Sequence, residues 1–276
     1  MVNVVLMAGH GKRFSDAGYK QSKPLIPVSG RPMIVRAAAS MPPADRWVFV
    51  VREEHAENGE LIESLKSIAR DVSIIVDHDP IGQLNSCLVA RNHYDREEGL
   101  FIGACDFGME YDGLAYKELI QGKGGEIPDM VVWSFTAQPN LTRNPRAWGW
   151  LIQDSHGKIT GVSVKVPISD DPYHDYAITG SFTFKSGKDF IVIAEELMRR
   201  GTRVKNEFYI DSMIGVAISL GRAVYSFPVN KYIGWGTPAD YEEYCRWEEI
   251  FRKSGGEECQ SEPEYQFWKE YFRMKG

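Results

Sequence analysis

Residues 2–14 read VNVVLMAGHGKRF, an apolar run that stops at a glycine-rich turn. Asn3 is the only polar residue between Val2 and Met7. Short apolar runs that end at glycines are typical of buried strands in a parallel sheet. Glycines at this place expose backbone N–H groups that can hold phosphate oxygens, and Arg13 adds a planar guanidinium suited to phosphate. The stretch predicts an α/β fold with a phosphate-binding turn; a plain strand-to-helix turn is the alternative.

Two other kinds of nucleotide-binding loop do not fit this turn. A dinucleotide-binding fingerprint requires a third small residue three positions after Gly11, where this chain has Phe14. A Walker loop requires Gly-Lys followed by Ser or Thr, and here Gly11-Lys12 is followed by Arg13. The sequence therefore argues against a dehydrogenase and against a Walker-type protein.

Further apolar runs follow, and helical patterns separate them. The runs lie at residues 47–51, 72–76, 100–105 and 130–135, and the helical patterns at 32–41, 57–70 and 86–93. Alternating strands and helices predict a mostly parallel sheet with right-handed connections. After Trp133 the pattern changes. We expect antiparallel strands at 148–152, 159–166 and 181–184, and helices at 188–200, 211–220, 238–251 and 263–274.

Composition narrows the class of protein. The chain has 276 residues with ordinary hydrophobic and charged fractions of 43% and 25%, which excludes disordered and fibrous classes. The formal net charge of −6 argues against nucleic acid as a partner, and no apolar run approaches the roughly 20 residues that span a membrane. The N-terminus lacks the basic stretch of a secretory signal, and the four cysteines are not spaced as a zinc or redox pair. We expect a cytoplasmic protein with reduced thiols.

A second motif follows the glycine-rich turn at Lys23-Pro24-Leu25 and continues to Gly30-Arg31-Pro32-Met33. Because Lys23 precedes a proline, its backbone is held extended. A lysine so placed can reach the phosphates held by the turn, although alone it would be read as a solvated side chain. The combination of Gly-x-Gly-x-Arg-Phe, Lys-Pro-Leu and Gly-x-Pro-Met resembles the beginning of the sugar-phosphate nucleotidylyltransferases.

The resemblance implies the nucleotide-diphospho-sugar transferase fold, a Rossmann-like mixed α/β sheet with an antiparallel acceptor lobe and C-terminal helices. It implies one domain over residues 1–276, with a nucleotide-binding half (1–135), an acceptor-binding half (136–237) and C-terminal helices (238–276). Gly82 and Gln83 stand where the family reads the nucleobase; Asn85 or Ser86 could also cap the following helix. The nucleotide-binding residues implied are Met7, Ala8, Gly9, Gly11, Lys12, Arg13, Lys23, Gly82, Gln83 and Ser86.

Asp106 follows the apolar run at 100–105, at the strand end where open α/β sheets bind ligands. A carboxylate there can hold Mg²⁺ that bridges phosphates, and the resemblance makes Asp106 a metal ligand. The alternative is an aspartate that only forms a turn. The family commonly has a second metal-binding aspartate two residues before Gly-Thr-Pro, but here Gly234 occupies that position. Either Asp106 acts with phosphates and water, or another carboxylate such as Asp211 substitutes.

Later segments resemble the family's acceptor site. They contribute Lys165, which would contact the phosphate of the second substrate, together with Gly180, Glu207 and Tyr209. Val164 departs from the glutamate usual before that lysine. Glu207 or Asp211 could hold hydroxyls or metal, or could cap the next helix. Three aromatic residues either shape the acceptor pocket or belong to the core: Trp148, Trp150 and Tyr173.

Gly18-Tyr19 and the segment at 206–209 resemble a subgroup associated with capsule and surface-polysaccharide biosynthesis. The implied reaction joins an NTP to a phosphorylated small molecule and releases pyrophosphate. CTP or UTP is favoured over GTP as the NTP. Arg13, Lys23 and Lys165 would act through positioning and charge, with Mg²⁺ as cofactor. A glycosyltransferase is disfavoured because Gly108 replaces the second aspartate of Asp-x-Asp; a non-catalytic nucleotide-binding regulator is the third reading. No membrane partner is expected, and the last helix docks on its own domain or forms a homodimer contact.

Overall fold

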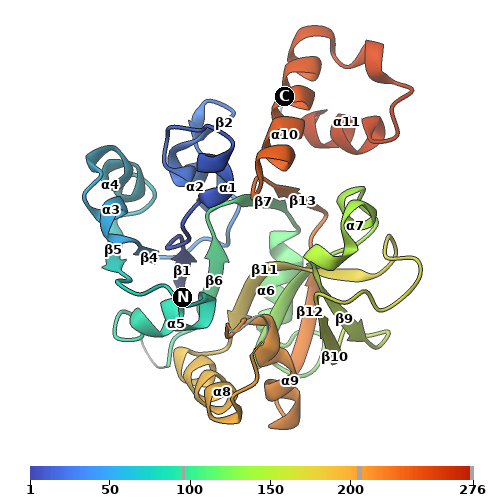
Figure 1. Ribbon diagram of the computed structural model, residues 1–276. Coiled ribbons are helices and arrows are strands. Elements are labelled where there is room, and N and C mark those ends of the chain that lie inside the picture. The colour runs from blue at the N-terminus through green and yellow to red at the C-terminus, as the bar shows by residue number, and fades with distance from the viewer. Residues whose placement is uncertain (95–96, 204–206, 274–276) are drawn as a thin grey trace.

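The computed structural model describes residues 1–94, 97–203 and 207–273 (Figure 1). Four parallel strands form one half of the central sheet, as the sequence predicts. In chain order they are β1 (Val2–Leu6), β4 (Arg46–Val51), β5 (Asp71–Val76) and β6 (Leu100–Ala104). β1 lies between β4 and β6, and β5 pairs with the other side of β4. The carboxyl ends of β1 and β6 therefore lie side by side.

The helices of this half are short. They are α1 (Lys12–Asp16), α2 (Met33–Ala38), α3 (Glu53–Ala56), α4 (Gly59–Lys66) and α5 (Gln83–Val89). A 3₁₀ turn (Lys23–Leu25) and a small ribbon of β2 (Pro27–Val28) and β3 (Arg31–Pro32) connect α1 to α2. α5 begins three residues before the expected 86–93, because Gly82 turns the chain with a φ of +136° that favours glycine.

The second half of the sheet is mixed. Its strands are β8 (Met130–Phe135), β9 (Gly149–Gln153), β10 (Ile159–Val164), β11 (Tyr176–Phe184) and β12 (Val224–Pro228). β11 runs antiparallel to β6 and so joins the two halves into one sheet, while β12 is parallel to β8. β11 is longer than the expected 181–184 because its pairing with β8 continues past an irregularity between Ile178 and Phe182.

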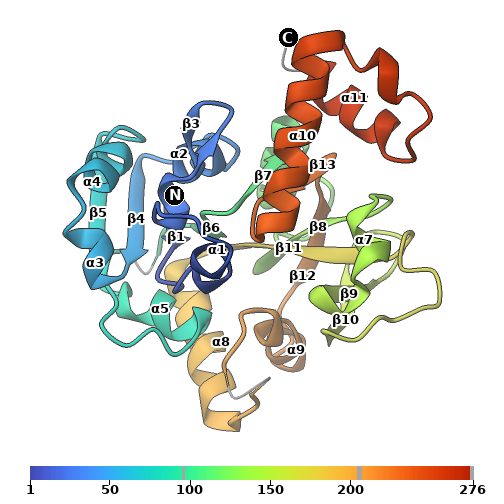
Figure 2. The ribbon, with the colours of Figure 1, turned by 45° about the horizontal axis from the view of Figure 1, so that its top comes forward.

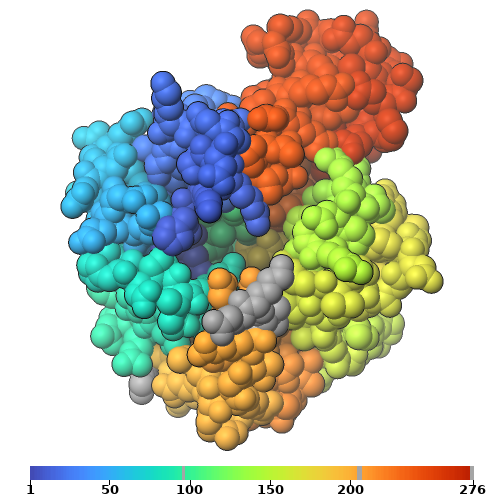
Figure 3. All heavy atoms as spheres, in the orientation of Figure 1, coloured from blue at the N-terminus to red at the C-terminus, as the bar shows by residue number. Residues whose placement is uncertain are grey.

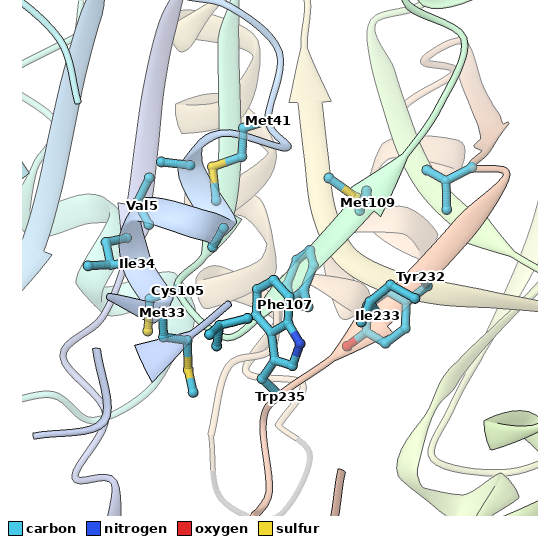
Figure 4. Close-up of a cluster of buried hydrophobic side chains, with 14 of the residues drawn as sticks. Val5, Met33, Ile34, Met41, Cys105, Phe107, Met109, Tyr232, Ile233 and Trp235 are labelled. Carbon is cyan, nitrogen blue, oxygen red and sulfur yellow. The ribbon is translucent and has the colours of Figure 1, made fainter. Parts of the chain in front are cut away.

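A separate two-stranded ribbon is not hydrogen-bonded to the main sheet over the residues that the structure describes. It pairs β7 (Phe107–Glu110) with β13 (Lys231–Gly234), and neither strand was predicted from the sequence. The helices not predicted in this part are α6 (Gly113–Ile120) and α7 (Asn140–Arg143). Trp235, just after β13, is buried, and a Cβ at Gly108 of β7 would lie 2.9 Å from its ring. Figure 4 shows Trp235 in the core with Met33 and Tyr232 on either side in this view.

Alternating side chains of the strands fill two apolar clusters. Val5 and Phe49 belong to one cluster, and their chain neighbours Val4 and Val48 to the other. The second cluster includes side chains of α8 (Gly187–Arg200) and α9 (Asp211–Ser219). Figure 2 shows these two helices at the end of the molecule opposite the C-terminal helices.

The C-terminal helices α10 (Pro238–Ser254) and α11 (Tyr265–Arg273) project from the body (Figure 1). α10 continues three residues beyond the expected 251. The last helix docks on its own chain, since the ring of Trp268 lies 6.0 Å from Tyr244 and 6.4 Å from Trp247 of α10. Met274, the expected end of that helix, lies outside the described residues.

α10 touches both halves of the molecule. The Tyr241 hydroxyl donates to the Pro27 carbonyl at 2.7 Å, and its ring packs against Phe14 and Tyr19. On the other side, Arg143 of α7 pairs with Glu243. Among the described residues, no helix combines the length and apolar character that crossing a membrane requires.

Candidate active site

A cleft of about 350 Å³ opens at the carboxyl ends of β1 and β6, and we call it the central cleft. Figure 3 shows this face of the molecule hollowed between the N-terminal half and the second half. Ten of the predicted site residues line the cleft: Met7, Ala8, Gly9, Gly11, Lys23, Gly82, Gln83, Ser86, Asp106 and Glu207. Six further residues were not predicted: Leu6, His10, Pro24, Pro80, Ala104 and Cys105.

The glycine-rich turn forms one wall of the cleft. Gly11 has a φ of +61° and precedes α1, a conformation that favours glycine over residues with a side chain. In the described part of the chain, the backbone N–H groups of Gly9, His10 and Gly11 donate no hydrogen bond. These donors are available to an anionic ligand, as the sequence predicts for a phosphate-binding turn.

Lys23 and Asp106 meet inside the cleft. The Lys23 Nζ lies 2.6 Å from Asp106 Oδ2, and both side chains are largely buried. Burial lowers the pKa of Lys23, but the Asp106 carboxylate more than offsets this and the pKa is raised above its usual value. Lys23 is therefore a fixed cation, 5.7 Å from the Phe14 ring centroid and beside the glycine-rich turn.

The surroundings of Asp106 can be tested against the Mg²⁺ that the resemblance implies. Among the described residues, no three His, Cys, Asp or Glu side chains come together as a complete ligand set. A Cβ at Gly234 would lie 3.2 Å from the Tyr232 ring, so this tyrosine crowds the place of the family's second aspartate. Mg²⁺ often uses one or two carboxylates and takes its remaining ligands from water and phosphates. A site in which Asp106 is the single protein carboxylate fits that mode of binding.

The turn before α5 forms the opposite wall. A Cβ at Gly82 would lie 3.4 Å from the Cβ of Glu207, and the Leu84 N–H donates to the Phe208 carbonyl at 3.4 Å. Glu207, predicted to contact the acceptor, thus lies beside the loop predicted to read the nucleobase. Asn206 of the same motif lies outside the described residues.

Lys165 and Asp211 lie together but are not part of the cleft wall. Lys165 has a φ of +64°, and its ammonium donates to the Ala147 carbonyl. A non-glycine residue in this conformation is uncommon and clusters at functional sites. Burial raises the pKa of Asp211, and the positive charge of Lys165 partly offsets this.

Gly149 makes room for the Asp211 carboxylate, since a Cβ there would lie 2.6 Å from Oδ2. Asp211 is the first residue of α9, and the residue that caps the helix is Ile210, without a side-chain hydrogen bond. The alternative that Asp211 caps this helix is therefore wrong.

The other predicted residues surround the cleft opening. Lys12 and Arg13 are exposed beside it. Burial raises the pKa of Tyr209, with help from Glu207 and Asp211, while the positive charge of Arg13 opposes the shift. Arg13 and Tyr209 are thus close enough to interact although they come from different halves. A Cβ at Gly180 would lie 3.7 Å from the Phe107 ring, next to Asp106 in the chain.

The structure distinguishes the three aromatic residues that the sequence assigned either to the acceptor pocket or to the core. Trp150 is fully buried and belongs to the core. Trp148 is half-buried and packs edge-on against Phe135 and Tyr232. Tyr173 lies in a loop, where its carbonyl accepts from the Ala137 N–H at 2.7 Å.

Residues 3–121 match the family of MobA-like NTP transferase domains. This part of the chain, less than half of its length, is therefore similar to MobA-like NTP transferase domains. The matched part supplies the glycine-rich turn, Lys23, the Gly82 loop and Asp106, whereas Glu207 reaches the cleft from outside it.

Solved structures share the fold over most of the chain. A nucleoside-diphosphate-sugar pyrophosphorylase from Vibrio cholerae superposes with a TM-score of 0.69 at 18% identity, covering 89% of this chain and 100% of its own. An inositol-1-phosphate CTP transferase from T. maritima superposes with a TM-score of 0.65 at 15% identity, and the superposition covers 91% of this chain and 96% of the transferase. No curated protein matches the sequence. The expected nucleotide-diphospho-sugar transferase fold is confirmed.

Proposed function

We propose that this protein is a nucleotidyltransferase that couples an NTP to a phosphate monoester and releases pyrophosphate. The observation that carries the proposal is the meeting of unpaired turn N–H groups, the Lys23 ammonium and the Asp106 carboxylate in one cleft. The match to MobA-like NTP transferase domains supports an NTP as substrate, and the names of the two structural neighbours support sugar or inositol phosphates as acceptors.

In this reaction an oxygen of the acceptor phosphate forms a bond to the α-phosphorus of the NTP. The bond from that phosphorus to the bridging oxygen of pyrophosphate breaks, and pyrophosphate leaves with the electron pair. The acceptor phosphate is already an anionic nucleophile, so the protein needs no general base. Its contribution is positioning and charge neutralisation.

Each charged residue has a place in this scheme. The turn N–H groups, Arg13 and Lys23 steady the triphosphate and the leaving pyrophosphate. Lys165 orients the incoming phosphate. Mg²⁺ held by Asp106 would neutralise phosphate charge. We favour CTP or UTP as the nucleotide and a sugar 1-phosphate or other phosphorylated metabolite as the acceptor, in the cytoplasm and in capsule or surface-polysaccharide synthesis.

The deciding experiment measures pyrophosphate release from each of the four NTPs with a panel of phosphate monoesters. We expect release that requires both substrates and is lost in Asp106→Asn. Consumption of a nucleotide sugar without pyrophosphate would instead indicate a glycosyltransferase. Tight nucleotide binding with no turnover for any acceptor would indicate a regulator, and either result would reject the proposal.

A further inference from the structure

Asp77 holds the loop that leads into α5. It directly follows β5, and its side chain is only 3% exposed. Its Oδ2 accepts a hydrogen bond of 2.6 Å from the Ser86 hydroxyl, and its Oδ1 accepts one of 3.2 Å from the Asp79 N–H. One carboxylate therefore fixes both ends of the loop that presents Pro80 and Gly82 to the central cleft.

This carboxylate is buried without a cation. Within the described ranges, Asp77 forms no ion pair, and both of its hydrogen-bond donors are neutral. Burying a charge without a counter-charge costs stability. If this side chain only held the loop in place, a neutral hydrogen-bonding side chain would make the protein more stable. Departures of this kind from favourable local chemistry are expected at functional sites.

The hydrogen bond to Asp77 determines what Ser86 can offer a ligand. A serine hydroxyl has one proton and two lone pairs, and a carboxylate only accepts. The Ser86 hydroxyl lies 2.6 Å from Asp77 Oδ2 and 3.3 Å from the Gly82 carbonyl, and both neighbours are acceptors. Its proton is therefore directed into the protein, and toward the cleft it presents lone pairs alone.

A phosphate does not suit this position, because it is itself an acceptor and the Asp77 charge lies behind the hydroxyl. We propose that Ser86, oriented by Asp77, accepts a hydrogen bond from the exocyclic amino group of a nucleobase. Among pyrimidines this selects cytosine, which has an amino group at the position where uracil has a carbonyl. The inference rests on the proposed function and narrows its substrate from CTP or UTP to CTP.

Asp77 is then a positioning residue, and replacing it with asparagine gives a specific prediction about nucleobase preference. In Asp77→Asn the new amide donates to the Ser86 oxygen, so a carboxylate no longer holds the hydroxyl proton. That proton can then turn from the Gly82 carbonyl, 3.3 Å away, to a carbonyl in the cleft. The variant should therefore accept the uracil carbonyl better than wild type does. Asp79→Asn is the matched control, because it removes the same charge from an exposed neighbour two residues away.

The experiment is calorimetric titration of the full chain with CTP and with UTP. We expect wild type and Asp79→Asn to bind CTP about tenfold tighter than UTP, and Asp77→Asn to lose or invert this ratio. Ser86→Ala should lose the preference and Ser86→Thr should keep it, which tests the idea even if Asp77→Asn does not fold. Equal binding by wild type, or an unchanged ratio in folded Asp77→Asn and Ser86→Ala, overturns the inference while leaving nucleotidyl transfer intact. If neither CTP nor UTP binds, the inference fails; absence of binding by ATP and GTP in the same titration would reject the proposed function as well.

Discussion

Lys23 is a largely buried cation in the wall of the central cleft, and its removal tests directly what its charge contributes to the reaction. We expect Lys23→Ala to lower kcat/KM for pyrophosphate release by about 10²–10³-fold, as loss of one preorganised donor does elsewhere. The measurement is steady-state release from the best NTP and acceptor pair. Lys188→Ala, an exposed lysine in α8, is the control and should keep full activity. Equal activity of the two variants would contradict a phosphate-binding role for Lys23.

Gly11 shows where the backbone of the turn depends on glycine. Its φ is +61°, and a Cβ would meet only ordinary van der Waals contact with the Lys23 Cβ at 3.5 Å. Gly11→Ala should therefore cost about 1–2 kcal/mol of unfolding free energy through backbone strain alone. Gly9→Ala is the control, because Gly9 has open space and no positive φ. Urea denaturation of both variants measures the difference, and equal midpoints would contradict this account.

Residues next to strand ends could be predicted from the apolar pattern of the sequence, whereas Glu207 could be predicted only from the resemblance to a family. Gly11 and Asp106 follow apolar runs directly, so the topology of a parallel sheet places them at one edge. Glu207 reaches the cleft through a segment with no such pattern. Asp77 was not among the predicted site residues, because only the fold shows that its carboxylate meets Ser86.

At the scale of elements, the contact between α7 and the C-terminal helices predicts a pH dependence. Arg143 pairs with both Glu243 and Glu264. Burial, and then the neighbouring Glu243, raise the pKa of Glu264 to about 7, above its usual value. The folded protein thus binds more protons than the unfolded chain at intermediate pH, and this group's stabilising contribution is lost as the pH rises to about 7 and beyond.

Glu264→Gln mimics the protonated form and should become the more stable variant, relative to wild type, as the pH rises from about 5 to about 8. Thermal unfolding across that range measures the difference, with Glu257→Gln as an exposed control. The pKa of Glu243 is lowered, so its protonation changes the stability with the opposite sign and at a lower pH. It therefore does not affect the comparison between about pH 5 and about pH 8. A constant difference between wild type and Glu264→Gln would contradict the raised pKa.

Long apolar elements were predictable and short ones were not. The strands of the first half, all of five or six residues, are clear in the sequence. β7 and β13 have four residues each, and each contains a glycine. They pair with each other across a long separation in the sequence, and Trp235 and Tyr232 pack against their glycines. This is a tertiary effect that no local pattern reveals.

At the scale of the whole molecule, nucleotide binding should stabilise both halves together, because one sheet and α10 join them. An NTP at about 100 times its dissociation constant adds about 2.7 kcal/mol to the unfolding free energy. Scanning calorimetry should show a single transition that moves upward with CTP. The nucleoside cytidine, which lacks phosphates, should shift it far less. A similar shift with cytidine would mean that the phosphates contribute little.

The contact of α10 with the N-terminal turn also affects how the protein is made. Tyr19 bonds to Glu242, which the ribosome adds 223 residues later. At about 5–20 residues per second, a nascent chain spends roughly ten seconds or more with this support for the first loop still missing. The first loop therefore gains this hydrogen bond only after α10 has been translated, so the N-terminal half leaves the ribosome without it.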